Sequence, residues 1–249
     1  MKRPLNGVRV GSTDSDENQT IAEIYAAALE RAQIAVVRRM RVADAANTFA
    51  ALQSGEIDVF PDPRPRDANA VHGSITWLKP APANDSPCLV TSQFAAEQYW
   101  LLRLTKCAAI APELRLAATP EFLAPGGPLQ RLQRYYGGFH FKETIPSAAG
   151  TQLYVMNRGE AEVANATTTD PNIADAQLIV LSDDKHFWPE RHTAPAVRLD
   201  VLRIHRRLRT ALDGISAKLT IYRLQQVTRR QQLLDIDPRD VAEEFVNGE

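Results

Sequence analysis

The chain has 249 residues, of which 44% are hydrophobic and 24% are charged, and its formal net charge is −1. Enough apolar material is present for one large core or two smaller ones. The balanced charge excludes a global basic footprint, so we expect no nucleic-acid partner, and the lack of an apolar run of about 18 residues excludes a membrane span.

The residues before the first predicted strand contain no apolar segment, so they do not form a signal peptide. Two interpretations stay open: a cytoplasmic protein, or an exported protein whose signal segment lies upstream of Met1. Cys88 and Cys107 lack both the C-x-x-C and the zinc spacing. We expect two half-buried thiols, with a disulfide between them as the alternative.

Strands and helices alternate from the first residues onward. Apolar residues between Ile21 and Leu29 recur at helical spacing, and Asp16 with Gln19 three residues later predicts the cap of that helix. Gly55 predicts the C-terminal cap of a second helix, since glycine takes positive φ without strain. The predicted strands are 8–14, 34–37 and 56–60, and the second helix spans 43–53.

The same order returns downstream, shifted by roughly 105 residues, which indicates a duplicated half. Segments 52–59 and 156–163 are the most similar pair. The repeated strands are predicted at 114–121, 139–143 and 160–164, with helices at 129–136 and ending at 153–157. Strands that alternate with helices predict a mostly parallel sheet in each half, covered by its own helices.

Two proline-containing segments separate the halves. Residues 80–87 precede a predicted strand at 88–91, and residues 187–195 precede another at 196–198. Three helices follow, at 201–212, 218–234 and 238–246, the last with Asp237 as N-cap and Pro238 in its first turn.

These elements predict an α/β protein with a two-lobed, periplasmic-binding-protein-like fold of type II. Residues 5–88 with 194–249 form the first lobe and 89–193 the second, with hinges near 84–91 and 189–196. Ligands of open α/β sheets bind at the carboxyl ends of the strands. We therefore expect a solute to bind between lobes that close about the hinges.

Six short motifs in order resemble the glycine betaine/choline/carnitine-type substrate-binding proteins of ABC importers, the osmoprotectant family. The motifs are residues 11–12 with 17–25, 54–62, 77–85, 118–122, 168–170, and 183–187 with 194–198. The resemblance implies a protein that captures a small solute for a membrane permease without a cofactor. It also implies an extracytoplasmic monomer, lipid-anchored after export.

The chain departs from that family where its tyrosine box would hold a quaternary ammonium by cation–π attraction. The segment before Trp77 is shortened. The residues found in place of the expected ones are Pro63, Arg64, Pro65, Pro87, Pro125, Thr167, and Arg191 or His192. The scaffold is kept while the cage is lost, which implies an altered ligand preference.

Polar residues near the predicted strand ends are therefore the candidate ligand-binding set. They are Thr13, Asp14, Glu17, Asn18, Asn84, Asp85, Glu121, Thr167, Thr168, Asp170, Arg191 and His192. Asp14 and Glu121 suit a cationic or hydroxylated solute, and Arg191 suits a carboxylate. Helix capping explains Asp14 and Glu17 equally well, and a capped turn explains Asp170.

No pattern indicates an enzyme or a metal site. The nucleophile elbow, the phosphate-binding loop and the dinucleotide fingerprint are absent, and the histidines lack ligand spacing. A basic stripe, Arg203, Arg206, Arg207 and Arg209, has the pattern of a solvated helix face. Besides the importer-binding protein we keep two alternatives: an intracellular ligand-sensing module of the same fold, and a degenerate family member that acts through protein contacts.

Overall fold

The computed structural model describes residues 7–63, 67 and 69–248. Two compact units divide the chain, Met1–Asp85 with Arg191–Glu249, and Ser86–Glu190. The first predicted lobe ends at residue 88 at the first crossing, whereas the first unit ends at 85. The second predicted lobe ends at residue 193, whereas the second unit ends at 190. The difference arises because strand β6 (Pro87–Thr91) begins inside the predicted first lobe but pairs in the sheet of the second unit.

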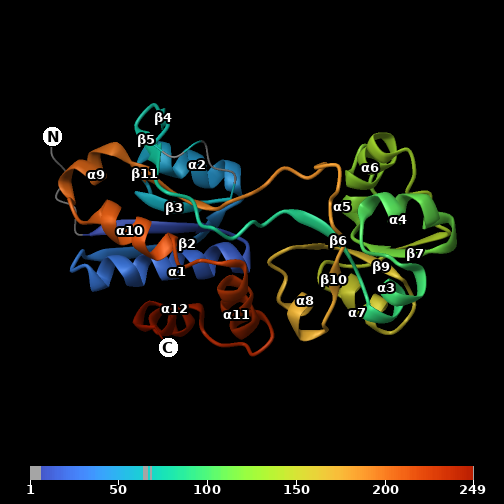
Figure 1. The fold of residues 1–249 in the computed structure, drawn as a ribbon. Coiled ribbons are helices and arrows are strands. Elements are labelled where there is room, and N and C mark those ends of the chain that lie inside the picture. Colours follow the sequence, from blue (N-terminus) through green and yellow to red (C-terminus); the bar gives the residue numbers. More distant parts are fainter. Residues whose placement is uncertain (1–6, 64–66, 68, 249) are drawn as a thin grey trace. The chain divides into compact units, whose positions relative to one another are not determined.

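The first unit is built on a six-stranded sheet in the order β2-β1-β3-β11-β5-β4 (Figure 1). Strand β1 pairs in parallel with both β2 and β3, while β11 runs antiparallel to β3 and to β5. The strands are β1 (Val8–Thr13), β2 (Val36–Ala43), β3 (Val59–Asp62), β4 (Val71–His72), β5 (Ile75–Trp77) and β11 (Ala194–Arg198).

Helices cover both faces of this sheet. Helix α1 (Asp16–Arg31) shares a core with Val8 and Val10 of β1 and with three C-terminal helices, α10 (Leu208–Ser216), α11 (Ile221–Gln232) and α12 (Pro238–Asn247). Helix α2 (Ala45–Ser54) packs on the other face, where Leu52 and Phe60 join a second core. The short α9 (Leu199–Ile204) follows β11. None of the described helices has an apolar stretch long enough to cross a bilayer.

The second unit has a five-stranded sheet in the order β10-β6-β9-β7-β8. Its strands are β6, β7 (Arg115–Ala118), β8 (Glu143–Pro146), β9 (Val163–Thr167) and β10 (Ile179–Val180). Helices α4 and α6 contribute Leu104 and Leu132 to the core of one face, and α7 contributes Leu153 and Met156 to the core of the other. The helices are α3 (Gln93–Tyr99), α4 (Leu104–Ile110), α5 (Pro120–Leu123), α6 (Pro128–Tyr136), α7 (Thr151–Asn157) and α8 (Pro171–Asp175), with a 3-10 turn at Ala111–Glu113.

Strand pairing displays the repeat expected from the sequence. In the second unit β7 pairs in parallel with β8 and β9, as β1 does with β2 and β3 in the first. Each parallel trio is extended by an antiparallel strand from a crossing segment, β11 beside β3 and β6 beside β9. The two halves are therefore built alike, each with one strand supplied by the chain that joins them.

A buried ion pair ties β1 to the start of β3 in the first unit. The guanidinium of Arg9 bonds both carboxylate oxygens of Asp58, at 2.6 and 2.8 Å, and also donates to the carbonyl of Gly55. The backbone N–H of Arg9 donates to the same carboxylate, and the N–H of Asp58 donates to the carbonyl of Arg9. The side chain of Asp58 has no exposed surface, so this bidentate pair is desolvated and geometrically fixed.

The second unit repeats this arrangement with a glutamate. Arg115, at the start of β7, bonds Glu162, which directly precedes β9, at 2.5 Å, and its guanidinium donates to the carbonyl of Gly159 at 2.9 Å. Burial alone would raise the pKa of Glu162, but the hydrogen bonds and charge of Arg115 hold that pKa below its ordinary value. Gly55 and Gly159 both have positive φ, 78° and 75°, so each turn has the same form.

Several predicted element boundaries were wrong. Ser15, not Asp16, caps α1, because its side chain accepts the N–H of Asn18. The strand predicted at 139–143 lies later, as β8, since Phe139 takes the left-handed conformation with φ 62°. The predicted helix 201–212 is interrupted at His205–Arg207.

Other strands are shifted for reasons of packing. Strand β2 continues through the basic stretch, because Arg38 faces α1 and pairs with Glu23 and Glu30. The strands predicted at 56–60 and 160–164 begin three residues later, since Asp58 and Glu162 belong to the arginine-bound turns.

Cys88 and Cys107 form no disulfide and are buried, with 4% of Cys88 and none of Cys107 exposed. The expectation of half-buried thiols was wrong, and so was the disulfide alternative. Burial raises the pKa of the Cys107 thiol well above its ordinary value, so this side chain packs as a small apolar group.

Removing the charge of Asp58 should strongly reduce the stability of the fold, because Asp58 is the buried counterion of Arg9. Asp58→Asn should lower the free energy of unfolding by about 2–4 kcal/mol, because Arg9 keeps a half-buried charge without its counterion. Glu162→Gln should cost about 1 kcal/mol or less, since that pair is partly solvated. Urea denaturation of both variants measures the difference, and equal effects would contradict this account.

The lowered pKa of Glu162 predicts a pH dependence. Because the folded-state pKa lies below the unfolded value, the stabilisation is fully present above the unfolded pKa and is lost as the pH falls through the folded one. The gap in unfolding free energy between wild type and Glu162→Gln should hold from neutral pH to about 5 and shrink below about 4. Urea titrations along that range would contradict the assignment if the gap stayed constant.

Candidate functional site

The carboxyl end of the first sheet is organised by Asn18. Its side-chain oxygen accepts the N–H of Thr13 at 2.8 Å, and its Nδ2 donates to the carbonyl of Pro61 at 2.7 Å. Asn18 is 5% exposed, and so is Thr13. One amide thus joins the end of β1 to β3, which places the Thr13–Asn18 loop at the edge where ligands of α/β sheets bind.

The second sheet has a matching arrangement around Asn165, a residue that the sequence pattern did not single out. Thr119 follows β7 as Thr13 ends β1, and its N–H donates to the side-chain oxygen of Asn165 at 3.0 Å. The backbone carbonyl of Asn165 accepts from Nε2 of Gln152 at 3.1 Å. The position of Thr119 in the repeat could have marked it as a counterpart of Thr13. Asn165 lies on β9, and no motif in the sequence marked it as a framing residue.

The predicted acidic residues divide by exposure. Asp14 is exposed, and its carbonyl accepts from Arg41, which also pairs with Asp16. Glu17 is partly buried in the first turn of α1, and Glu121 is exposed in the first turn of α5. Carboxylates at helix starts are favourable with the helix dipole, so helix stability accounts for the positions of Glu17 and Glu121.

Four predicted residues of the first unit lie together where the chain crosses. The side chain of Asn84 accepts the N–H of Arg191 at 2.9 Å, and the N–H of Asp85 donates to the carbonyl of Arg191 at 2.7 Å. Nδ1 of His192 is 3.1 and 3.0 Å from the carbonyls of Ala81 and Ala83. Since carbonyls only accept, this nitrogen carries the proton.

In the second unit Thr168 holds the other end of the crossing, while Thr167 and Asp170 have other surroundings. Thr168 exchanges hydrogen bonds with Ser86, through its backbone N–H at 3.0 Å and its hydroxyl at 3.2 Å. Asp170 is the N-cap of α8 and accepts the N–H of Asn172. Thr167 is exposed at the end of β9, beside Thr169. Asp170 and Thr168 therefore have structural partners, and Thr167 presents the open surface.

The three tryptophans occupy different environments. Trp77 is buried, stacks on Phe49 and donates to Asp62 at 2.8 Å, which commits it to the core. Trp100 is 80% exposed. Trp188 is partly buried against Phe122 of α5, with ring centroids 6.4 Å apart, and its indole N–H is buried without a hydrogen-bond partner.

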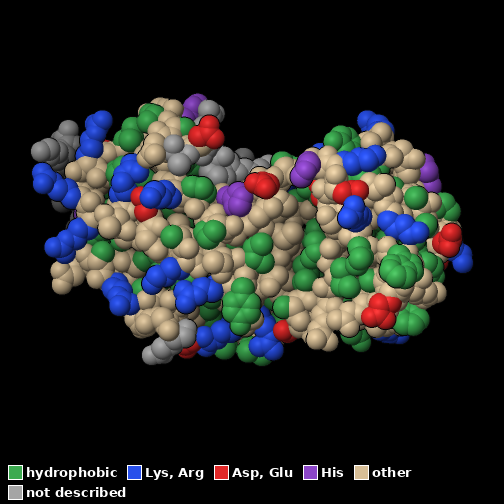
Figure 2. Space-filling view, in the orientation of Figure 1, with side chains coloured by type: hydrophobic (Ala, Val, Ile, Leu, Met, Phe, Trp, Pro, Cys, Tyr) green, Lys and Arg blue, Asp and Glu red, His purple; other side chains and the backbone are tan. Residues whose placement is uncertain are grey.

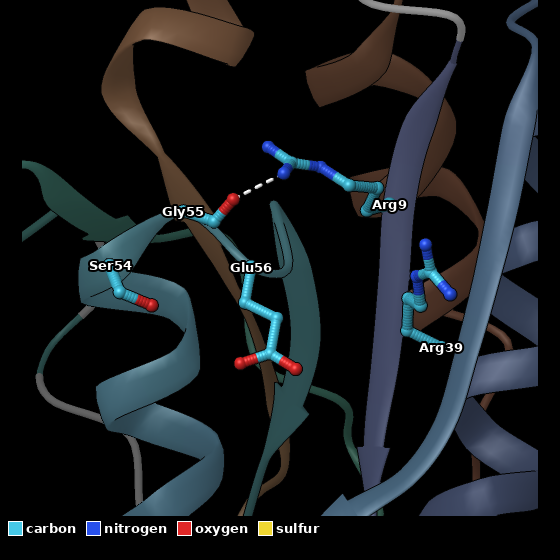
Figure 3. A pocket seen from close by; sticks show the side chains of 5 residues that line it. All are labelled: Arg9, Arg39, Ser54, Gly55 and Glu56. Carbon is cyan, nitrogen blue, oxygen red and sulfur yellow. Dashed lines mark hydrogen bonds between the residues drawn. The ribbon is translucent and has the colours of Figure 1, made fainter.

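A pocket of about 540 Å³ lies in the first unit near the amino ends of β1 and β3 (Figure 3). Arg9, Arg39, Ser54, Gly55 and Glu56 line it. It contains none of the predicted ligand-binding residues, and Arg9 is committed there to Asp58 and Gly55. The pocket is thus at the edge of the sheet opposite Thr13.

Other charged groups suggest no second site. Within residues 7–63, 67 and 69–248, no three His, Cys, Asp or Glu side chains gather as metal ligands. Arg203, Arg206 and Arg207 are exposed, and Arg207 and Arg209 bond Gln33 and Asn69. The four arginines do not share one helix face, because α9 ends at Ile204 and α10 begins at Leu208. Figure 2 shows basic side chains scattered over the visible face of the first unit among polar and apolar ones. Arg64 and Pro65, which replace part of the tyrosine motif, lie outside the described residues.

Comparison with known proteins covers nearly the whole chain. The family model described as "Substrate binding domain of ABC-type glycine betaine transport system" matches residues 6–248. The glycine betaine-binding protein YehZ of Escherichia coli (strain K12) is 25% identical over 272 residues, which cover 96% of this chain and 89% of that protein. The carnitine transport binding protein OpuCC of Listeria monocytogenes is 21% identical, over 69% of this chain and 56% of that protein.

Solved structures confirm the predicted fold class. Apo YehZ superposes with a TM-score of 0.80 at 24% identity, covering 97% of this chain and 98% of that one. A glycine betaine/carnitine/choline ABC transporter structure gives a TM-score of 0.85 at 22% identity, covering 96% and 97%. Lactococcal OpuAC in complex with glycine betaine gives 0.64 at 13% identity, covering 96% and 95%.

The role of Asn18 predicts a stability effect. Asn18→Ala should lower the free energy of unfolding by about 1–3 kcal/mol, because the buried N–H of Thr13 and carbonyl of Pro61 both lose their partner. Asn157→Ala, on the exposed end of α7, is the matched control and should change it by less than about 0.5 kcal/mol. Chemical denaturation of both variants tests this, and similar effects would exclude a framing role for Asn18.

Proposed function

This chain belongs to the family of substrate-binding domains of ABC-type glycine betaine transport systems, and we propose that it holds its solute at the carboxyl ends of its two sheets. The observation that carries the proposal is the matched framing of the two edges, by Asn18 around Thr13 and by Asn165 around Thr119. Each frame fixes a strand-to-helix loop with polar groups at the edge where α/β sheets bind ligands. The family match over residues 6–248 supports a role in solute import rather than catalysis.

The proposed site combines the two edges with the crossing. Thr13, Asp14, Glu17 and Asn18 contribute from the first unit, and Glu121, Thr167, Thr168 and Asp170 from the second. Asn84, Asp85, Arg191 and His192 contribute from the crossing. Asp14 and Glu121, both exposed, supply negative charge for a cationic solute, and Arg191 supplies a partner for a carboxylate.

We propose further that the ligand preference differs from that of a tyrosine-box protein. Thr167 and Pro87 stand where the family resemblance places aromatic rings, and neither offers a π face. Trp188, partly buried beside Phe122, is the ring best situated to replace them. A solute richer in hydroxyls than glycine betaine, held by carboxylates and amides, suits these residues.

The partner in this proposal is the permease of an ABC importer, which receives the solute from a monomeric binding protein outside the cytoplasmic membrane. The family, and relatives named as glycine betaine- and carnitine-binding proteins, support this assignment. An intracellular sensor of the same fold would bind solute without delivering it. Uptake of labelled solute by cells with and without the gene separates the two.

Loss of the tyrosine cage predicts weak binding of glycine betaine. Without two or three cation–π contacts at roughly 1–2 kcal/mol each, affinity falls by about two to four orders of magnitude, to a Kd in the millimolar range or weaker. Isothermal titration calorimetry measures this Kd, after a thermal-shift screen of betaines, choline, carnitine and polyols has identified the preferred solute.

A Trp188→Ala variant tests whether Trp188 replaces the missing aromatic rings. The preferred solute should bind it more weakly, by about tenfold, if Trp188 contributes a ring to the site. Micromolar binding of glycine betaine that is unchanged in Trp188→Ala would mean that a cage exists elsewhere in the chain. If micromolar binding of glycine betaine is also unchanged in Thr167→Ala and in Glu121→Gln, the proposed site is refuted.

A further inference from the structure

Gln152 carries a buried hydrogen-bond acceptor that the protein leaves unpaired. The residue is 5% exposed, in the first turn of α7, and its Nε2 donates to the carbonyl of Asn165 at 3.1 Å. Its Oε1 is buried and has no hydrogen-bond partner. Because the Asn165 carbonyl can only accept, the amide must turn its nitrogen toward it, so the unpaired atom is the oxygen.

Such an atom calls for a physical explanation. The large majority of buried polar side-chain atoms in native proteins have a partner, and an unpaired one is destabilising. Thr228 is another nearly fully buried residue with an unpaired polar atom, but it lies in α11, and its hydroxyl can rotate to donate or accept. A side-chain amide held at its nitrogen has no such freedom.

The position of Gln152 connects it with the proposed site. Asn165, which receives its Nε2, uses its own side chain to hold the N–H of Thr119 at the carboxyl end of the second sheet. The turn before it, residues 148–151, is exposed throughout and contains Gly150 with φ 85°, where an added Cβ would meet no atom within 4 Å. The structure therefore leaves open space beside this turn.

We propose that Gln152 is a specificity-determining residue, whose Oε1 accepts a hydrogen bond from a hydroxyl or N–H group of the solute. This inference rests on the proposed function and narrows its ligand class. A carboxylate or an ether oxygen has no hydrogen to donate to Oε1 of Gln152, and a quaternary ammonium has no N–H group. Glycine betaine therefore leaves Gln152 unpaired, whereas a hydroxylated or N–H-bearing cation pairs with it.

Two matched pairs of solutes test the proposal. N,N-dimethylglycine, protonated at neutral pH, differs from glycine betaine by one N–H in place of an N-methyl group, and choline differs from its O-methyl ether by one hydroxyl. Calorimetry on the full chain should give at least about tenfold tighter binding of the donor-bearing member in one pair or both. Gln152→Leu should abolish that preference, and Gln98→Leu, on the exposed face of α3, should retain it.

The unliganded protein provides a second readout. Gln152→Leu loses one hydrogen bond and one unpaired acceptor together, so its melting temperature should stay within about 3 °C of wild type. A markedly lower melting temperature with an unchanged solute preference would assign Gln152 a purely structural role and overturn the proposal. Equal affinities within both pairs would also overturn it, while leaving the proposed function intact. Wild-type protein that binds no member of either pair, nor any other compatible solute, would refute the proposed function itself.

Discussion

The arginine–carboxylate pair at the base of each parallel trio is the interaction on which the arrangement of both sheets depends. Arg9 joins β1 to the turn before β3 through Asp58 and Gly55, and Arg115 joins β7 to the turn before β9 in the same way. A strand of only four or five residues has few ladder bonds, so a bidentate charged pair sets its register strongly. With the register set, the opposite ends of the same strands present their loops at one edge.

At that edge the chain uses asparagine amides rather than charges. A side-chain amide has both an acceptor and donors, so Asn18 can hold the N–H of Thr13 and the carbonyl of Pro61 together. The second unit distributes the same work between Asn165 and Gln152. The charged side chains nearby, such as Asp14 and Glu121, remain exposed, which leaves them accessible to a solute. The amides thus hold the backbone at each edge, while the carboxylates of Asp14 and Glu121 face the solvent.

Part of the predicted site proved to have structural partners. Thr168 binds Ser86 and Asn84 binds the backbone of Arg191, so these two residues stabilise the crossing segments, whereas Asp170 caps α8. A polar residue beside a strand end looks the same in a sequence whether it caps a helix or faces a ligand. Only the hydrogen-bond partners distinguish these roles, and they belong to segments up to about a hundred residues away.

The sequence by itself determined the fold class and the repeat, because these depend on periodicity and on local signals such as Gly55 and Gly159 at helix ends. The family was indicated separately, by the resemblance of six short motifs in order. The sequence also indicated the crossings, through their prolines. Only the tertiary structure decided which residues frame the sheet edges. Asn165 meets Thr119 because β9 pairs with β7, and Gln152 reaches Asn165 from α7. No spacing along the chain encodes these contacts. The sequence pattern placed the starts of β3 and β9 three residues too early for the same reason. The turns at Asp58 and Glu162 are held by arginines from strands distant in the sequence. The burial of Cys107 likewise follows from packing against helices whose order in space the chain alone does not specify.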